Sequence, residues 1–340
     1  MIRIDVSEIK NWELIKKKHS EWYEKKILPN IKKAHTLLLS KKTKDDSIKK
    51  YKELLKKIIE RGENYVIEEE LFLGYDDDEI KNILDLIKKL KNDFKKSNLS
   101  EDYLPHKLFS YDKFPNHTGE WNRHKLLSLM EIEVCPYCQR NYISSFEEND
   151  DKRTTADLDH FYPKSLYPFL ALSLYNFIPS CQICNSRFKG TKDTYNSVYP
   201  YEESFDDLGA KFKTSKEIIY EILGEKDANF FVEIDYKNLK NKDREKVEKS
   251  IKHLGLDKVY KKSHNQYIKD LLDNIEKYPK NYLESCVEIF DEYYKDKNKK
   301  EKIIKYFIDI VKEPYRKRIE NGEPLAKLTK DILDEFKIKI

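Results

Sequence analysis

Two stretches of the first hundred residues place apolar side chains every three or four positions, between residues 51 and 59 and between residues 80 and 94. This spacing predicts amphipathic helices, because residues three or four apart lie on one face of a helix. Gly62 is placed to end the first helix, and the acidic run DDDE suits the positive N-terminal end of the second. The apolar positions are Tyr51, Leu54, Leu55, Ile58 and Ile59, then Ile80, Ile83, Leu84, Ile87, Leu90 and Phe94.

The pattern changes after residue 100. Prolines and a glycine predict a linker that runs into a short helix from Trp121 to Met130. Farther along, the string FFVEIDY predicts a strand, and residues 303–311 and 332–336 predict helices. We therefore expect a helical N-terminal region over 1–100, a linker and lead-in helix over 101–130, a cysteine-bracketed module over 131–205 and a mainly helical region over 206–340.

Four cysteines form two C-x-x-C pairs, Cys135 with Cys138 and Cys181 with Cys184. Two such pairs can close tetrahedrally on one Zn²⁺, and four thiolates leave no open position for catalysis, so we expect a structural zinc. The alternative is that these cysteines are unrelated. Cys286 lies on an apolar helical stripe and is expected to be a buried core thiol.

Charged residues make up 38% of the chain, yet the net charge is only +4, so a nucleic-acid site must come from local clustering of cations. No segment approaches the roughly 20 apolar residues of a membrane helix, and the first residues lack the apolar stretch of a signal peptide. Paired cysteines suit a reducing compartment. We expect a cytoplasmic protein with no membrane partner.

Between the cysteine pairs, residues 141–146 and 154–158 can pair as two strands around a polar turn. Asp159 and His160 would then lie at the end of the second strand. A carboxylate beside an imidazole can divide two roles, oxygen ligand for a hard cation and general base for a water. On this pair alone, a structural histidine is the better interpretation.

Further polar residues surround that pair. Asn185 directly follows Cys184 and begins the short helix CNSRFKG, in which Asn185 and Lys189 share a face. The Asn185 amide oxygen can join Asp159 on a metal ion, with the Lys189 ammonium beside it. Asn176, in the loop YNFIPS, offers an amide to orient the His160 imidazole.

Three cations on these segments are candidates for phosphate contacts: Lys164, Arg187 and Lys189. Each offers a charge-assisted hydrogen-bond donor. Each could equally be an ordinary exposed cation. No residue in the sequence indicates base-specific recognition.

The strings CPYC, DLDHFYPKS, YNFIPSC and CNSRFKG resemble, in order, the HNH or ββα-metal nuclease superfamily in its form with a four-cysteine zinc site. The resemblance covers residues 130–205. It implies a mainly α chain with a small α+β insert, in which a ββα-metal core is flanked by helical regions. It also implies that His160 is the general base, that Asp159 and Asn185 hold one catalytic divalent ion, and that Asn176 positions the base.

The third position of the literal H-N-H pattern is Asn185 here instead of a histidine. Oxygen ligands with waters suit Mg²⁺ or Mn²⁺, so one of these is the expected catalytic ion beside the structural zinc. The strings DHFYPKS and IPSC most resemble those of HNH nucleases of Septu-type antiphage defence systems, which act with an ATPase. That resemblance implies a nucleic-acid substrate, with DNA favoured, and an ATPase partner, while the helical flanks could also serve oligomerisation.

Two other functions fit the same sequence. One is a non-catalytic, zinc-stabilised nucleic-acid-binding module, and the other is an adaptor in which the zinc only stabilises the fold. Catalysis by His160 makes a separate prediction. An unperturbed histidine pKa of about 6.5 predicts a cleavage rate that rises from about pH 6 and levels off near roughly pH 8.

Overall fold

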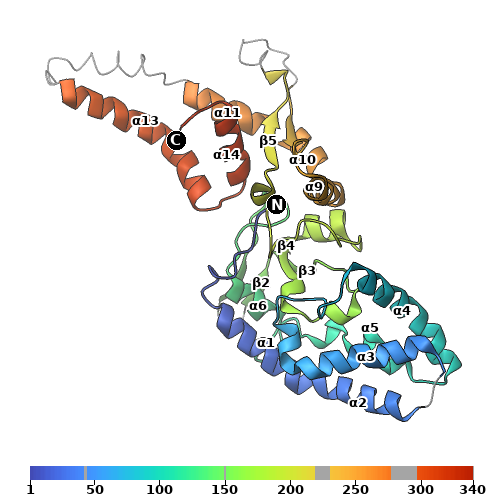
Figure 1. The fold of residues 1–340 in the computed structure, drawn as a ribbon. Helices are drawn as coiled ribbons and strands as arrows, with labels where there is room; N and C mark the ends of the chain where they lie inside the picture. Colours follow the sequence, from blue (N-terminus) through green and yellow to red (C-terminus); the bar gives the residue numbers. More distant parts are fainter. Residues whose placement is uncertain (42–43, 149–150, 219–229, 277–296, 340) are drawn as a thin grey trace. The chain divides into compact units, whose positions relative to one another are not determined.

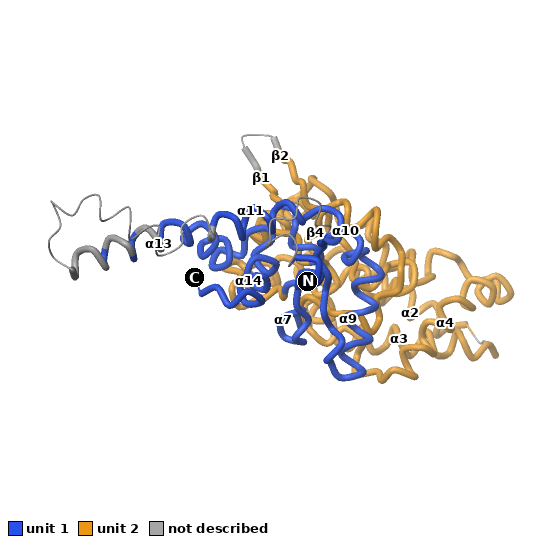
Figure 2. Tube along the Cα trace, turned by 90° about the horizontal axis from the view of Figure 1, so that it is seen from above, with its two compact units in different colours: residues 1–2, 137–142, 203–340 blue, residues 3–136, 143–202 orange. Residues whose placement is uncertain are grey.

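The structure is a computed structural model that describes residues 1–41, 44–148, 151–218, 230–276 and 297–339. These residues are mainly helical, with small two-stranded antiparallel sheets. The chain divides into two compact units, coloured separately in Figure 2. Unit 1 comprises Met1–Ile2, Tyr137–Tyr142 and Glu203–Ile340, and unit 2 comprises Arg3–Pro136 and Ile143–Glu202. The four regions expected from the sequence stay a prediction.

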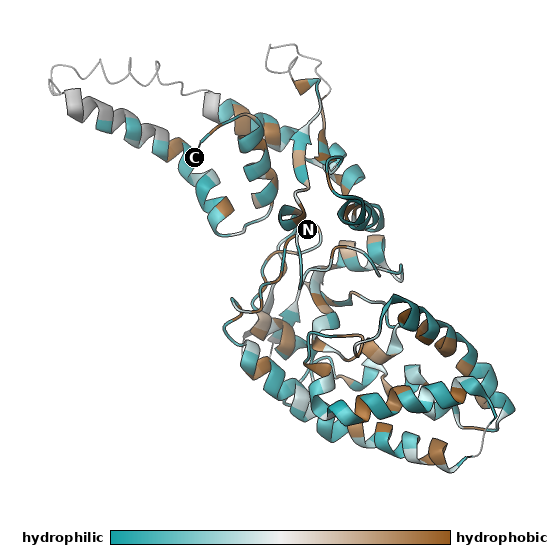
Figure 3. Ribbon diagram, in the orientation of Figure 1, coloured by the Kyte–Doolittle hydropathy of each residue, from teal (hydrophilic) through white to brown (hydrophobic). Residues whose placement is uncertain are grey.

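Four long helices form the N-terminal part of unit 2 (Figure 1): α1 (Trp12–Lys26), α2 (Leu28–Ser40), α3 (Asp46–Arg61) and α4 (Asp77–Lys96). Along the chain, α1 packs against α2, α2 against α3, and α3 against α4. Residues of α1 to α4 are mostly hydrophilic, with hydrophobic residues recurring along each helix (Figure 3). This amphipathic pattern places one face of each helix in a shared apolar core.

Both helices predicted from apolar spacing are confirmed as α3 and α4. Gly62 ends α3 with a φ of 61°, a positive value that a glycine adopts without strain. Asp76 caps α4 by accepting a hydrogen bond from the Glu79 backbone, while the Glu79 carboxylate accepts one from Asp76. The buried residues of α4 are Ile80, Ile83, Leu86, Leu90 and Phe94.

Short helical turns connect α4 to the cysteine module. The lead-in helix expected at Trp121 to Met130 is confirmed as α6 (Arg123–Met130), with Asn122 as its N-cap. α6 packs against the strands that follow it. The shorter turns between α4 and α6 are η2 (Glu101–Tyr103), α5 (Pro105–Leu108) and η3 (Tyr111–Lys113), whereas η1 (Gly62–Val66) lies between α3 and α4.

The first sheet pairs β1 (Ser145–Glu148) with β2 (Asp151–Thr154). The expected pairing of residues 141–146 with residues 154–158 is therefore wrong for most of the second segment. Only Thr154 of that segment pairs with β1, and residues 156–158 belong to the next sheet. The Thr154 side chain accepts a hydrogen bond from the Ala156 backbone at 3.0 Å, and this local turn separates β2 from the next strand.

The second sheet pairs β3 (Ala156–His160) with β4 (Phe177–Cys181), so that His160 lies opposite Phe177. His160 is the last residue of β3, where the sequence predicted a strand end. The connection contains the turns η4 (Pro168–Leu170) and η5 (Leu174–Asn176). After β4 comes η6 (Ile183–Lys189), a π-helix that ends at Gly190 and confirms the short helix expected in CNSRFKG. Two strands and a helical segment thus follow one another around the candidate site.

Unit 1 contains a third sheet and the C-terminal helices. β5 (Lys211–Thr214) pairs with β6 (Val232–Asp235), which confirms the strand expected in FFVEIDY. The Asp331 carboxylate on α14 (Ala326–Glu335) accepts a hydrogen bond from the Phe212 backbone at 2.8 Å and joins this helix to β5. The other helices are α7 (Phe205–Leu208), α9 (Asn241–Leu254), α10 (Leu256–Ser263), α11 (Asn265–Glu276) and α13 (Lys297–Glu320).

The two C-terminal helices expected from the sequence are confirmed, one inside α13 and the other at the end of α14 to within one residue. Cys286, expected to be a buried core thiol, lies outside the described residues. Across the described ranges, no helix combines the length and apolar character needed to cross a membrane.

Candidate functional site

The four cysteines of the two C-x-x-C pairs form one buried cluster. The sulfur atoms of Cys135, Cys138, Cys181 and Cys184 all lie within 4.8 Å of one another. Tetrahedral Zn–S bonds of about 2.3 Å require sulfur separations of roughly 3.8 Å, so this donor set fits zinc. The Cys181 backbone N–H also donates to the Cys135 sulfur at 3.3 Å, a contact that favours a thiolate.

Beside this cluster, two carboxylates on β3 face two side chains on η6. Asp157 and Asp159 are two residues apart on a strand and therefore project to the same face. The Asn185 amide donates to Asp157 Oδ2 at 3.0 Å, and Lys189 Nζ lies 3.1 Å from Asp159 Oδ2. The structure thus pairs Asn185 with Asp157, whereas the sequence predicted that Asn185 and Asp159 act together.

Lys189 is directed inward. Its side chain is 2% exposed, and its ammonium also donates to the His160 carbonyl at 2.6 Å. Burial lowers the pKa of Lys189, while the adjacent Asp159 carboxylate opposes that change. Lys189, expected as a phosphate contact, is therefore engaged with Asp159 and the β3 backbone in this arrangement.

The His160 imidazole is held in one tautomer. Its Nε2 lies 2.9 Å from the Ala171 carbonyl oxygen, and a carbonyl can only accept, so Nε2 carries the hydrogen. In the neutral ring, Nδ1 then keeps its lone pair. Burial lowers the pKa of His160 to about 3, the Ala171 hydrogen bond opposes this change, and the charges of Lys164, Lys189 and Arg123 lower it further. The ring is neutral at physiological pH.

Asn176 was expected to orient the imidazole with its amide. The structure shows this fully buried amide bonded to the backbone instead. Its Oδ1 accepts from the Tyr162 N–H at 2.7 Å, and its Nδ2 donates to the carbonyls of Tyr162 and Leu170 at 3.1 and 3.0 Å. Asn176 therefore fixes the loop after β3 at Leu170, and the residue after Leu170, Ala171, holds His160.

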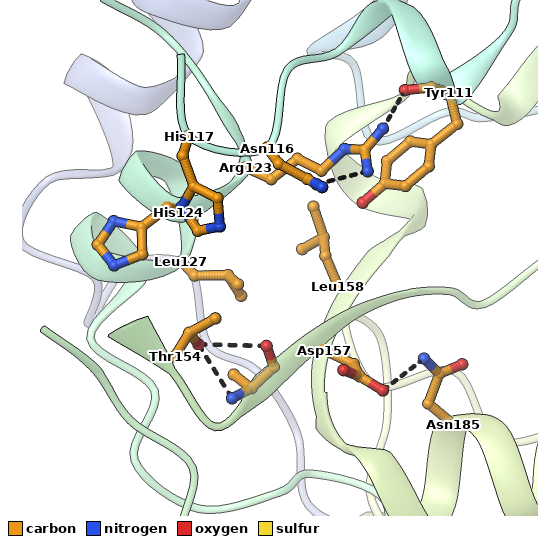
Figure 4. Close-up of a pocket in the computed structure, with 11 residues that line it drawn as sticks. Tyr111, Asn116, His117, Arg123, His124, Leu127, Thr154, Asp157, Leu158 and Asn185 are labelled. Atoms are coloured by element: carbon orange, nitrogen blue, oxygen red, sulfur yellow. Dashed lines mark hydrogen bonds between the residues drawn. The ribbon is translucent and has the colours of Figure 1, made fainter. Parts of the chain in front are cut away.

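A pocket of about 310 Å³ opens beside the Asp157–Asn185 pair (Figure 4). Asp157 and Asn185 lie on one side, and Arg123 and Tyr111 lie on another. Its polar lining suits a charged ligand better than an apolar one. The residues that line it are Tyr111, Asn116, His117, Arg123, His124, Leu127, Thr154, Ala156, Asp157, Leu158 and Asn185.

Tyr111 joins several charged groups around this pocket. Its ring contacts the His160 ring edge-on, with 4.5 Å between centroids. The Arg123 guanidinium lies 3.6 Å from the Tyr111 ring centroid, and Lys164 Nζ lies 4.8 Å from it. Lys164 is exposed and lines a second cavity, of about 260 Å³, which shares Tyr111 as a wall with the first. Arg187, the third expected phosphate contact, is exposed on η6.

Sequence reasoning missed Tyr111 and Arg123. Tyr111 belongs to the segment interpreted as a linker, and Arg123 belongs to the short helix expected after it; no recognised motif singles out either side chain. A weak signal was present: the stretch YDKFPNHTGEWNRH, which runs into α6, gathers three aromatic residues, two histidines and an arginine. Their relation to β3 appears only in the structure: the Tyr111 ring contacts His160, and both residues line the pocket that contains Asp157.

Comparison with known proteins gives a partial likeness. A segment of 70 residues is 34% identical to the Septu protein PtuB of Bacillus thuringiensis. The match covers 20% of this chain and 24% of that protein. The search for matching family models found none, and no solved structure matches the chain.

Proposed function

We propose that the protein is a metal-dependent HNH endonuclease that hydrolyses phosphodiester bonds of nucleic acid, with DNA as the favoured substrate. The order of two strands and a helical segment, next to a four-cysteine cluster that fits zinc, supports an HNH core. The partial likeness to a Septu protein supports a role in antiphage defence. The ATPase partner rests on the same likeness.

The fixed tautomer of His160 is the observation that carries this proposal. A general base needs a neutral imidazole with an available lone pair. The Ala171 carbonyl holds the hydrogen on Nε2, so Nδ1 is the nitrogen that can accept a proton from water. Asn176 supports this geometry by fixing the loop that carries Ala171. A water deprotonated by His160 would then attack the phosphodiester.

Asp157, Asp159 and Asn185 form the proposed binding set for one Mg²⁺ or Mn²⁺. Their carboxylate and amide oxygens are the ligands that such hard cations prefer. The Asp157–Asn185 pair lines the open pocket, whereas Asp159 is already neutralised by Lys189. Asp157 therefore joins the set that the sequence predicted. A bound divalent ion would supply electrostatic stabilisation of the charge that develops on the phosphate and on the leaving oxygen.

A non-catalytic nucleic-acid-binding module remains the second candidate. The buried ion pair between Lys189 and Asp159 favours it, because an ammonium occupies the carboxylate that an HNH enzyme would offer to its metal. In that case the zinc cluster and the cations would remain important, and His160 would have only a structural role.

Cleavage of plasmid DNA separates the two candidates. The wild-type protein, with any partner ATPase supplied, is incubated with and without Mg²⁺ or Mn²⁺, and His160→Ala is compared under the same conditions. We expect metal-dependent nicking by the wild type and a loss of at least about a hundredfold in the variant. No metal-dependent nicking by the wild type would refute the nuclease proposal, and retained DNA binding would then favour the second candidate.

A further inference from the structure

Arg123 is held rigidly at the edge of the pocket in Figure 4. Its Nη1 donates to Asn116 Oδ1 at 2.6 Å, and its Nη2 donates to the Tyr111 carbonyl at 2.5 Å. The guanidinium also lies on the Tyr111 ring. These contacts fix the plane of the guanidinium before any ligand arrives, so little side-chain entropy remains to be lost on binding.

Arg123 forms no salt bridge among the residues that the structure describes, although the Asp112 carboxylate interacts with it electrostatically. Its buried Nε also has no hydrogen-bond partner. Burial lowers the pKa of Arg123, although an arginine keeps its charge at any physiological pH. A fixed, partly buried cation that forms no salt bridge is a favourable site for an anion.

Arg61 provides a contrast within the same unit. Its side chain is 29% exposed, and its guanidinium contacts Glu68 at 2.6 Å and Glu70 at 2.8 Å. Both arginines are therefore partly buried, but of the two only Arg61 forms salt bridges with carboxylates. This difference distinguishes a binding arginine from a structural one.

The surroundings of Arg123 indicate which anion would bind. The pocket also contains Asp157 and Asn185, the proposed ligands of a divalent ion. The Tyr111 ring, on which the Arg123 guanidinium lies, also contacts the His160 ring. An anion at Arg123 would thus lie in the same pocket as the proposed ion and close to the proposed base.

We propose that Arg123, fixed by Tyr111 and Asn116, binds a backbone phosphate of the nucleic-acid substrate. This inference rests on the proposed function in one respect: it takes the pocket to be a binding site for nucleic acid. Tyr111 acts as the positioning residue, because its carbonyl and ring both hold the guanidinium. Phosphate contacts of this kind fix the position of the substrate without recognising its sequence.

Binding to a fluorescein-labelled DNA duplex, and to a single strand of the same sequence, tests the inference. Fluorescence anisotropy is measured over a series of salt concentrations without added divalent ion, so that no cleavage is required. Arg123→Gln should weaken binding by about tenfold for either DNA and lower the slope of log affinity against log salt by about one phosphate contact. Arg61→Gln, the matched control, should leave both quantities unchanged.

Three results would overturn the inference: no DNA binding by the wild type, an affinity and salt slope for Arg123→Gln within error of wild type, or equal losses in Arg123→Gln and Arg61→Gln. These outcomes are independent of cleavage. A protein that never nicks DNA but loses the salt-dependent contact in Arg123→Gln would refute the nuclease proposal and support this one.

A second measurement uses the unaltered protein, because removal of the Arg123 hydrogen bonds can also impair folding. Phenylglyoxal modifies accessible arginines, and mass spectrometry reports the extent at each residue. DNA should protect Arg123 severalfold and leave the modification of Arg61 unchanged. Equal modification of Arg123 with and without saturating DNA would overturn the inference.

Discussion

Lys189 Nζ lies 3.1 Å from Asp159 Oδ2, and the two side chains are 2% and 5% exposed. Removing one partner would leave the other charge buried without compensation, which typically costs about 3–5 kcal/mol. We expect Lys189→Met to lower the free energy of unfolding by about that amount. Urea denaturation followed by circular dichroism would measure the change.

The double variant Lys189→Met/Asp159→Asn serves as the control for this prediction. It removes both charges, so its loss of stability should be clearly smaller than the sum of the two single losses. Additive losses would show that the two side chains do not interact in solution.

The sequence predicted the helices of this protein better than its strand partners. Apolar spacing and the residues that end each helix were sufficient for α3 and α4, because these signals are local. Strand pairing is not local. The partner of β3 is the run FIPSC, which is short and includes Pro179, and no local pattern indicates that it pairs with residues about twenty positions earlier.

The candidate site shows the same limit. The cysteine spacing predicted a cluster that the structure contains, since two C-x-x-C pairs specify their own geometry. The partners of Asp159 and Asn185 could not be predicted, because they depend on how the face of η6 lies against β3. A shared helix face was correctly expected for Asn185 and Lys189, yet each contacts a different aspartate.

Asp157 and Asp159 should differ in their effect on metal dependence. Asp157 pairs with Asn185 in the open pocket, so Asp157→Asn should raise the Mn²⁺ concentration needed for half-maximal cleavage by at least about tenfold. Asp159→Asn removes the partner of a buried ammonium and should lower stability as well as activity. Cleavage assays over a range of Mn²⁺ concentrations, together with thermal melting, separate the two effects. A normal metal dependence in Asp157→Asn would exclude it from the binding set.

The pH dependence of cleavage should differ from the expectation for an unperturbed histidine. Burial lowers the pKa of His160 to about 3, so the imidazole is already neutral across the range from pH 6 to pH 8. We therefore expect no rise in the rate of the chemical step over that range from the titration of His160, in contrast to the rise predicted from the sequence. Single-turnover cleavage at several pH values would test this. A tenfold increase per pH unit up to about pH 7 would contradict it.

Substitutions at two adjacent residues should separate the loss of zinc from the loss of the proposed catalytic ion. Cys184 belongs to the sulfur cluster, whereas the Asn185 amide contacts Asp157. We expect Cys184→Ser to lose bound zinc and to unfold at lower temperature, because structural zinc contributes on the order of 10 kcal/mol. Asn185→Ala should retain zinc and lose cleavage. Elemental analysis and melting curves would measure both variants, and full zinc retention in Cys184→Ser would contradict the assignment of that ligand.

His19 makes the stability of unit 2 sensitive to acid. The ring is fully buried: Trp121 Nε1 donates to its Nδ1 at 3.0 Å, and its Nε2 lies 2.8 Å from the Leu172 carbonyl. Because both nitrogens have partners suited to the neutral ring, protonation would lose the Trp121 hydrogen bond. Burial lowers the pKa of His19 to about 4, and the Leu172 carbonyl opposes this change.

The unfolded chain binds a proton at His19 below about pH 6.5, whereas the folded chain does so only near pH 4, so stability must fall as the pH falls through this window. The pKa difference corresponds to about 3 kcal/mol. Urea unfolding of the wild type and of His19→Gln at pH 7, 5 and 4 would isolate this contribution, since all other titrating groups are common to both. We expect the variant to be less stable at pH 7 and the difference to narrow toward pH 4. A constant difference between the two proteins would show that His19 does not titrate as its burial requires.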